Sequence, residues 1–302
     1  MNFEHRFGSA PAWSLGAEEE LFLVDAETLE PARDGFSRVF GEASGPIKPE
    51  LFESFVEIAT GVHETPAEIE AELRELRREV AERAAAHGLA AIACGSHPTA
   101  RGDVPIVPVE RYQRLRDELG PRLHRQTVCG LHVHVSMPDP DTALRAFEGV
   151  IPELPRLLAA SANSPFWDGE PSGWRSIRSQ ILLEMPTGGT PPLLRSWDDW
   201  LAATQSDNTR RHWDAWPRPE YGTLEVRVLD QPTSLARTTA LVTEVQRLVR
   251  EAAESEHEPI DRGAYASERE RAAREGGGAE AERQLELGPE AALREIAVRT
   301  LE

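Results

Sequence analysis

Lysine is almost absent from this chain of 302 residues. Lys48 is the only lysine, and every other basic residue among the 33 Lys+Arg is an arginine. A Walker-type phosphate loop needs a lysine after a glycine-rich turn, whereas Lys48 lies in the segment G-P-I-K-P-E. Any phosphate handled here must therefore be bound by arginines, backbone amides or metal ions, and Schiff-base chemistry would fall on Lys48 alone.

Positive charge is scarce as a whole. The 52 Asp+Glu residues outnumber the 33 Lys+Arg and give a formal net charge of −19. Binding to nucleic acid relies on neutralising phosphates with basic side chains, so this composition argues against a nucleic-acid partner.

Cysteines and long apolar runs are also missing. Cys94 and Cys129 are too few for a disulfide-stapled secreted domain, and we interpret both as small buried hydrophobic residues. The N-terminal segment M-N-F-E-H-R-F-G-S-A has no long apolar region, and no run of 18 or more apolar residues occurs. From these absences we expect a cytoplasmic protein with no membrane partner.

The segment C-G-L-H-V-H-V, residues 129–135, carries the most informative pattern that is present. His132 and His134 lie two apart in an apolar run typical of a β-strand, so both imidazoles leave the same face of a sheet. Placing polar groups on a face that could have been core is costly unless a ligand or ion compensates. The pair therefore indicates a binding site, with zinc as one candidate ion.

Carboxylates repeat this pattern in two other strand-like segments. Glu18 and Glu20 share one face in L-G-A-E-E-E-L-F-L-V, and Glu225 lies beside Arg227 in G-T-L-E-V-R-V. Like charges this close stay ionised when a cation or arginines lie between them. Such carboxylate-rich surroundings favour magnesium or manganese over zinc.

The remaining periodicity predicts an α+β fold with a mostly antiparallel sheet and helices packed on one face. We expect strands at 14–25, 50–60, 89–94, 180–185 and around Glu225, and helices at 66–87, 142–162, 234–254 and 289–301. Residues 164–178 show no periodicity and are predicted to form a long loop. Residues 259–282, charged and containing three consecutive glycines, are predicted to be a mobile connection.

Nine motifs in order resemble the carboxylate–amine ligase family typified by the second type of glutamate–cysteine ligase. They cover roughly residues 14–250 and read G-A-E-E-E-L-F-L-V-D, V-E-I-A-T, G-S-H-P, Y-Q-R-L, V-C-G-L-H-V-H-V, S-P-F-W-D-G, S-G-W-R-S-I-R, M-P-T-G-G-T-P and Y-G-T-L-E-V-R-V-L-D. The resemblance implies a glutamine-synthetase-like fold, a curved antiparallel sheet whose concave face holds ATP, divalent metals and an amino acid. It implies a catalytic domain over 1–258, with 259–302 packed on or tethered to it.

The same resemblance implies a reaction and a set of site residues. The γ-phosphoryl group of ATP would pass to a carboxylate, most simply that of glutamate, and an amine such as that of cysteine would attack the acyl phosphate. Mg²⁺ or Mn²⁺ would be bound by metal ligands that the family places on the sheet: Glu18, Glu20, Glu57, His132, His134 and Glu225. Arg178 and Arg227 would be catalytic, and the substrate would contact Trp174, Arg175 and Thr187. By analogy we also expect small-molecule substrates and a homodimer.

Two departures from the family pattern leave other functions open. The run W-D-A-W-P-R-P has Trp216 where the family commonly has an arginine, with Arg218 two residues later, and the C-terminal part is short. The alternatives are a non-catalytic descendant that binds a nucleotide or amino acid, and a zinc metallohydrolase that uses the histidine pair.

Overall fold

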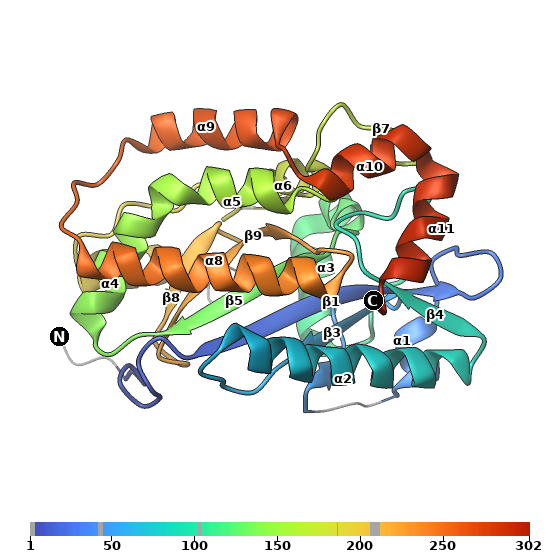
Figure 1. The fold of residues 1–302 in the computed structure, drawn as a ribbon, viewed down its shortest axis with the longest axis horizontal. Coiled ribbons are helices and arrows are strands. Elements are labelled where there is room, and N and C mark those ends of the chain that lie inside the picture. The colour runs from blue at the N-terminus through green and yellow to red at the C-terminus, as the bar shows by residue number, and fades with distance from the viewer. Residues whose placement is uncertain (1–3, 42–44, 102–103, 186, 206–211) are drawn as a thin grey trace.

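A seven-stranded sheet runs through the centre of the molecule (Figure 1). The structure, a computed structural model, describes residues 4–41, 45–101, 104–185, 187–205 and 212–302. The strand order is β2-β3-β1-β5-β9-β8, β4 also pairs with β1, and all of these pairs are antiparallel. The strands are β1 (Leu15–Asp25), β2 (Ile47–Lys48), β3 (Phe55–Ala59), β4 (Leu89–Ile92), β5 (Gly130–Ser136), β8 (Ala215–Arg218) and β9 (Thr223–Asp230). The predicted antiparallel α+β architecture is confirmed.

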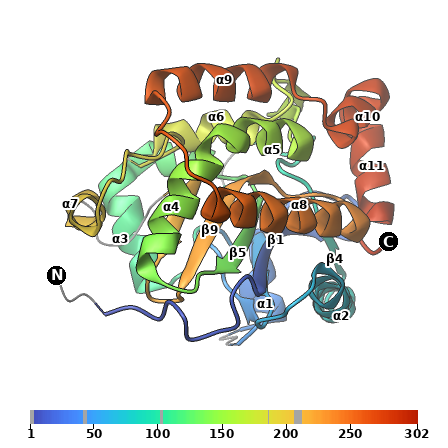
Figure 2. The ribbon, with the colours of Figure 1, turned by 60° about the vertical axis from the view of Figure 1, so that its left-hand side comes forward.

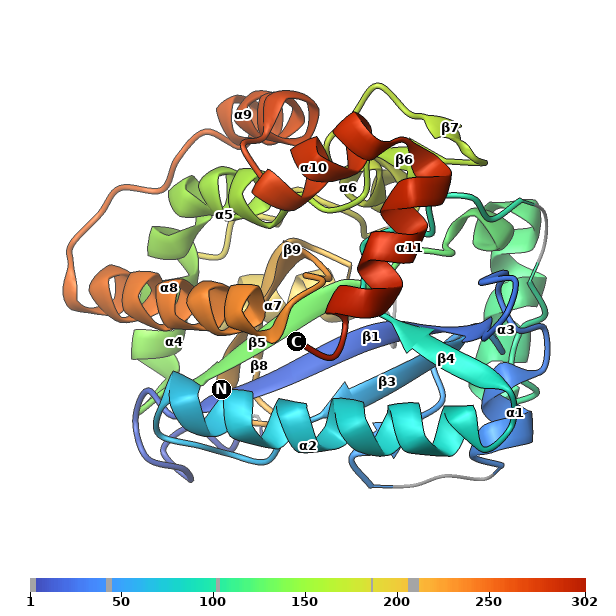
Figure 3. The same ribbon diagram turned by 45° about the vertical axis from the view of Figure 1, so that its right-hand side comes forward.

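Helices cover the sheet and its ends. Those of the first half are α1 (Gly35–Val39), α2 (Pro66–Ala85), α3 (Glu110–Leu119), α4 (Pro140–Val150) and α5 (Leu154–Ser161). Those of the second half are α6 (Ile177–Ile181), α7 (Trp197–Gln205), α8 (Leu235–Glu254), α9 (Arg262–Glu275), α10 (Ala279–Leu287) and α11 (Pro289–Arg299). The long helices α2 and α8 contact each other in front of the sheet, and α4 packs along α8 (Figures 1 and 3). This helical layer leaves the opposite face of the sheet for the site.

Strand β1 separates the two faces by strict alternation. Ala17, Leu21 and Leu23 point into the helical core and are buried, whereas Glu18 and Glu20 point to the other face and are half-buried. Their sequence pattern predicted this arrangement, and β1 is a central strand rather than a solvated edge.

Glu19, between those two carboxylates, lies on the helical side. It is fully buried and forms a two-point ion pair with Arg77 of α2, with both N–O distances 2.7 Å. Gln231 and Thr238 donate two further hydrogen bonds to the same carboxylate. A buried charge is tolerated when it is paired and hydrogen-bonded in this way, and the pair fastens α2 to the sheet.

Helix boundaries follow their capping residues. The Thr65 side chain accepts a hydrogen bond from the Glu68 amide while the Glu68 carboxylate accepts from the Thr65 amide, and Pro66 opens α2. The predicted helix at 142–162 is present as α4 and α5, interrupted by a 3₁₀ turn at Ile151–Glu153 that contains Pro152.

The prediction of a mobile connection over 259–282 is wrong, because the segment folds into α9 and α10. Asp261 caps α9 by accepting from the Ala264 amide, and α9 lies along α5 (Figures 1 and 2). Two of the three glycines, Gly276 and Gly278, serve close packing, whereas a Cβ at Gly277 would meet nothing within 4 Å. A Cβ at Gly276 would lie 2.9 Å from the Ala159 Cα, and one at Gly278 would lie 2.4 Å from a backbone oxygen of Ala162.

Three further predictions need correction. Residues 180–185 form the end of α6 and a 3₁₀ turn at Leu182–Glu184 instead of a strand. Only Phe55–Ala59 of the predicted strand 50–60 is extended. The predicted loop 164–178 contains a two-stranded sheet of β6 (Phe166–Trp167) and β7 (Glu170–Pro171), and α6 begins at Ile177. In all three cases short segments take their form from tertiary contacts that local sequence does not encode.

No helix within the described residues is both long enough and apolar enough to cross a membrane.

Candidate functional site

A cavity of about 420 Å³ opens on the sheet face that carries Glu18 and Glu20. Lys48 from β2 and Tyr221 from the turn between β8 and β9 both line it, although β2 and β8 are the two ends of the strand order. The sheet is therefore curved, and its concave face forms the cavity. Charged groups of both signs line it: the carboxylates Glu18, Glu20, Glu50 and Glu57, and the cations Lys48, Arg178, Arg218 and Arg227.

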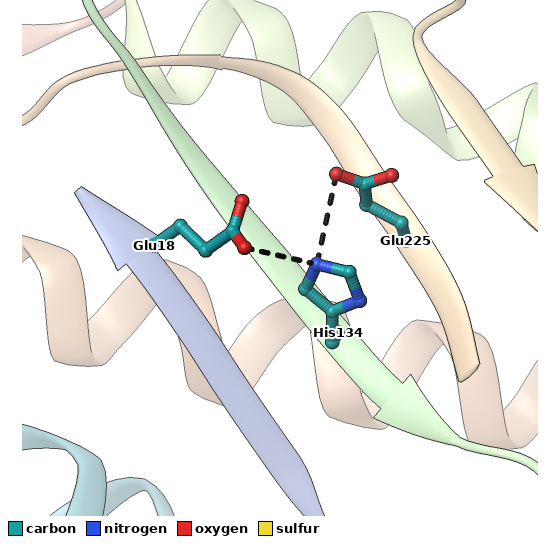
Figure 4. A group of neighbouring side chains, drawn as sticks. All are labelled: Glu18, His134 and Glu225. Atoms are coloured by element: carbon teal, nitrogen blue, oxygen red, sulfur yellow. Dashed lines mark ion pairs between the residues drawn. The ribbon is translucent and has the colours of Figure 1, made fainter. Parts of the chain in front are cut away.

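Three neighbouring strands bring together a group that could hold a metal ion (Figure 4). Glu18 of β1, His134 of β5 and Glu225 of β9 each offer one ligand atom, and these atoms lie within 4.8 Å of one another. The Nε2 atom of His134 is 3.6 Å from Oε1 of Glu225 and 3.9 Å from Oε1 of Glu18. Two carboxylates with one imidazole suit Mg²⁺ or Mn²⁺, so the chemistry of the donors fits the predicted ions.

Burial and neighbouring charges set the protonation of this group. Burial alone raises the pKa of Glu18, but the hydrogen bond with His132 and the charge of His134 outweigh it and lower that pKa to about 2. Burial lowers the pKa of His134, against the opposing effect of Glu225 and Glu18. Glu225 is also buried, yet Arg227 and Arg218 hold its pKa well below the usual range. The group therefore presents ionised carboxylates and an imidazole lone pair, the forms that bind metal.

The other predicted metal ligands line the cavity outside this group. His132 places Nδ1 3.3 Å from Glu18 and Nε2 3.9 Å from Glu20. Glu20 accepts a hydrogen bond of 2.6 Å from the Gly130 amide. Glu57 lies opposite Glu20 in the β1–β3 ladder but accepts a hydrogen bond of 3.0 Å from Lys48 Nζ. In this structure a lysine ammonium serves as the partner cation of Glu57.

Charge interactions also set the protonation of that pair. Burial raises the pKa of the Glu57 carboxyl, and Glu18 and Glu20 add to this effect while Lys48 opposes it. Burial alone lowers the pKa of Lys48, but Glu57 outweighs it and the pKa is raised, so the ammonium stays charged.

Two arginines contact Glu225 from the cavity side. Arg218 donates a hydrogen bond of 2.7 Å to Oε2, and Arg227 donates to Oε1. Strand β9 has one extra residue between Val226 and Leu229 in its pairing with β5, a bulge of the kind that re-aims side chains beside active sites. Trp216 is buried against Phe147, in the core rather than in the cavity. Arg218, two residues later, is the arginine of that run that reaches the site.

Arg178 is buried in the wall with unused hydrogen-bonding capacity. It is 3% exposed, and its Nη1 has no hydrogen-bond partner among the described residues. Its Nη2 donates to the Arg227 backbone oxygen at 3.3 Å and lies against Gly130, where a Cβ would come within 2.0 Å. A buried guanidinium with an unmatched donor is costly, and an anionic ligand in the cavity would satisfy it.

Helix α9 supports strand β9, which carries Arg227, and helix α6, which carries Arg178. Asp214, buried just before β8, accepts hydrogen bonds from Tyr265 (2.5 Å) and from Arg269 Nε (2.6 Å). Arg269 also donates to the Ser179 oxygen in α6 at 2.9 Å, and the Arg227 amide donates to the Asp214 oxygen at 2.8 Å. Asp214 and Arg269 neutralise each other within this network. The network therefore holds the backbone of α6 and β9 in place.

The predicted substrate contacts Trp174, Arg175 and Thr187 do not line the cavity. Arg175 forms an ion pair of 2.5 Å with Glu282 of α10, and the Arg274 guanidinium stacks on the Trp174 ring. Thr187 accepts a hydrogen bond from the amide of His212, a residue of the cavity wall. Pro186, in the motif M-P-T-G-G-T-P, lies outside the described residues.

Comparison with known proteins agrees with this geometry. The model of glutamate–cysteine ligase family 2 matches residues 14–300. The chain belongs to this family. A protein of Rubrobacter xylanophilus named as a candidate glutamate–cysteine ligase 2-1 is 36% identical over 271 residues, which cover 86% of this chain and 72% of the relative. A candidate glutamate–cysteine ligase 2 of Bradyrhizobium diazoefficiens is 35% identical over 257 residues, which cover 80% of this chain and 60% of that relative.

Solved structures support the fold of this family member. A bifunctional glutathione synthetase from Pasteurella multocida superposes with a TM-score of 0.59 at 17% identity, over 96% of this chain and 47% of the other. The glutamate–cysteine ligase of Francisella tularensis, solved with AMP, also gives 0.59, at 13% identity over 99% and 82% of the two chains. At these identities the likeness concerns the fold, and the predicted ligase-type fold is confirmed.

Sequence reasoning missed several residues of the cavity wall, among them Gln126, Tyr112 and Tyr221. Tyr221 belongs to a recognised motif, Y-G-T-L-E-V-R-V, and could have been found there. Tyr112 opens another of the quoted motifs, Y-Q-R-L, and could have been found there too, whereas Gln126 lies in a segment without a pattern that marks a site.

Proposed function

We propose that this protein is an ATP-dependent carboxylate–amine ligase, with glutamate as the carboxylate substrate and cysteine or a related amine as acceptor. The observation that carries the proposal is that Glu18, a member of the carboxylate–imidazole metal group, lines the same cavity as the buried guanidinium of Arg178, which has an unmatched donor. Family membership supports the same reaction class. The substrates and the acyl-phosphate route are proposed on these grounds.

The reaction balances in two steps. An oxygen of the substrate carboxylate attacks the γ-phosphorus of ATP, the bond to the β–γ bridging oxygen breaks, and ADP leaves. The amine nitrogen then attacks the acyl carbon, phosphate departs with the oxygen that came from the carboxylate, and the nitrogen loses a proton. Phosphoryl transfer needs positioning and positive charge more than covalent help from the protein, and a lysine-poor site can provide both.

The residues in the cavity wall and directly beside it each have a role in this scheme. Glu18, His134 and Glu225 would hold a divalent cation, which supplies positive charge for the phosphate oxygens, with His132, Glu20 and Glu57 beside them. Arg178 binds the carboxylate of the amino acid through its unmatched donor. Arg227 orients Glu225 and places positive charge where negative charge develops during transfer.

An ADP-release screen tests this proposal. Purified protein is incubated with ATP, Mg²⁺ or Mn²⁺ and pairs of amino acids and amines, and products are identified by mass spectrometry. We expect ADP and an amide, abolished by chelation and by Glu225→Gln but retained by Glu251→Gln, which removes an exposed carboxylate on α8. Absence of ADP with every pair would refute the proposal.

The same preparation distinguishes the alternatives. Nucleotide binding without turnover would indicate a non-catalytic descendant, and stoichiometric zinc that survives dialysis would indicate the metallohydrolase. Light scattering tests the expected homodimer.

A further inference from the structure

Lys48 lies on the cavity wall, in the strand at one end of the sheet. It is in the edge strand β2, directly opposite Glu57 of β3, and its side chain is 42% exposed. Its Nζ donates one hydrogen bond of 3.0 Å to Glu57 Oε1. Tyr221, which reaches the cavity from the far end of the strand order, interacts electrostatically with the same ammonium, as does Glu18 of the metal group. Lys48 and Glu18 of the metal group therefore line the same cavity.

The other cations of the wall are held more firmly. Arg218 contacts both Glu225 and Glu220, Arg227 contacts Glu225, and Arg178 is buried against the backbone. Lys48 has a long flexible stem, a half-exposed position and, among the residues that the structure describes, a single carboxylate partner at hydrogen-bonding distance. It is the wall cation best able to change partner when an anion enters.

The choice of lysine at this position is informative. Every other basic residue of the chain is an arginine, so a site that merely needed positive charge would have been filled by a guanidinium here too. An ammonium is a compact point charge with three rotatable donors, and it binds phosphate without the planar geometry of arginine.

We propose that Lys48 is a nucleotide-phosphate contact. In the ligand-free state it neutralises Glu57, and on nucleotide binding its ammonium moves to a phosphate oxygen and releases the Glu57 carboxylate toward the metal side. This inference rests on the proposed ATP-dependent function. It adds a residue to which neither the sequence motifs nor the resemblance gives a role, and it revises the expectation from the sequence that arginines, backbone amides or metal ions would bind any phosphate.

Nucleotide binding by calorimetry and steady-state kinetics test the inference on the intact protein. For Lys48→Met we expect MgATP binding about 10- to 100-fold weaker, the loss of one charge-assisted contact, with a matching rise in the KM for ATP. The KM for the amino acid should not change. Lys48→Arg should recover part of the affinity, and Arg250→Met, which removes an exposed cation on α8, should bind as the unaltered protein does.

Acylation gives a second measurement that needs no variant. Because the chain has one lysine, mass spectrometry after brief treatment with an acetylating reagent reports Lys48 alone, with the N-terminal amine as internal reference. We expect MgATP to slow acetylation of Lys48 and glutamate to leave it unchanged. Equal acetylation with and without bound MgATP, or unchanged ATP binding in Lys48→Met, would overturn the inference. If the unaltered protein binds no ATP, the proposed function itself fails.

Discussion

Replacing Gly130 with alanine should disable the site while leaving the fold intact. A Cβ at this position would lie 2.0 Å from Arg178 Nη2 and 2.5 Å from its Cζ, so the guanidinium must move. The atoms that must give way are the end of a flexible side chain beside a cavity, and residue 130 is in a regular strand. We therefore expect the free energy of unfolding to change by no more than about 1 kcal/mol.

The catalytic loss can be estimated from the contact that is displaced. A hydrogen bond from a charged donor contributes about 1.5–3 kcal/mol. At 1.36 kcal/mol for each factor of ten, its loss lowers kcat/KM by about 10- to 150-fold. The assays are ADP release under varied amino-acid concentration and urea unfolding. Gly277→Ala is the control, because a methyl group there meets open space.

A double-mutant cycle shows whether the effect passes through Arg178. Gly130→Ala should have little additional effect in an Arg178→Gln background, since the displaced group is already gone. Full activity of Gly130→Ala, or additive losses in the double variant, would refute the reasoning.

Three further predictions concern stability, each measured by urea unfolding. Glu19→Gln leaves the Arg77 charge buried without its counter-ion and should lower the free energy of unfolding by about 3–5 kcal/mol. A decrease below about 1 kcal/mol would contradict the account of that ion pair. Arg269→Gln leaves buried Asp214 with Tyr265 as its remaining side-chain donor within the described part of the chain. We expect this variant to lower the free energy of unfolding by about 3 kcal/mol, and an unchanged free energy would contradict the supporting role of α9. Burial lowers the pKa of His97 from 6.5 to about 4. The unfolded chain therefore binds a proton between pH 6.5 and 4 that the folded protein excludes, and stability falls by about 3 kcal/mol on acidification through this window. His97→Gln should reduce this dependence of stability on pH. If stability falls as steeply with acidification in the variant, the role given to His97 is wrong.

Periodicity was sufficient to predict the elements whose faces differ in chemistry. The alternation in β1 separated Glu18 and Glu20 from Glu19, and the spacing of His132 and His134 placed both imidazoles on the concave face. These predictions succeeded because a strand's period of two is a local property.

Other features depend on contacts between distant segments. Arg175 resembles Arg178 in sequence context, but one pairs with Glu282 of α10 and the other enters the cavity wall because α6 begins at Ile177. The glycine-rich segment after α9 looks mobile by composition, yet Gly276 and Gly278 allow close approach to Ala159 and Ala162. Such outcomes depend on which backbones meet, which local sequence does not specify.

Oxygen transfer from the carboxylate substrate to phosphate is the most direct test of the central claim. Glutamate labelled with ¹⁸O in its carboxylates is incubated with the protein, ATP, Mg²⁺ and the acceptor that gives turnover, and the released phosphate and the amide are analysed by mass spectrometry. A ligase acting through an acyl phosphate must transfer one ¹⁸O atom to phosphate for each amide formed. Unlabelled phosphate, or ADP released without an amide, would contradict the account.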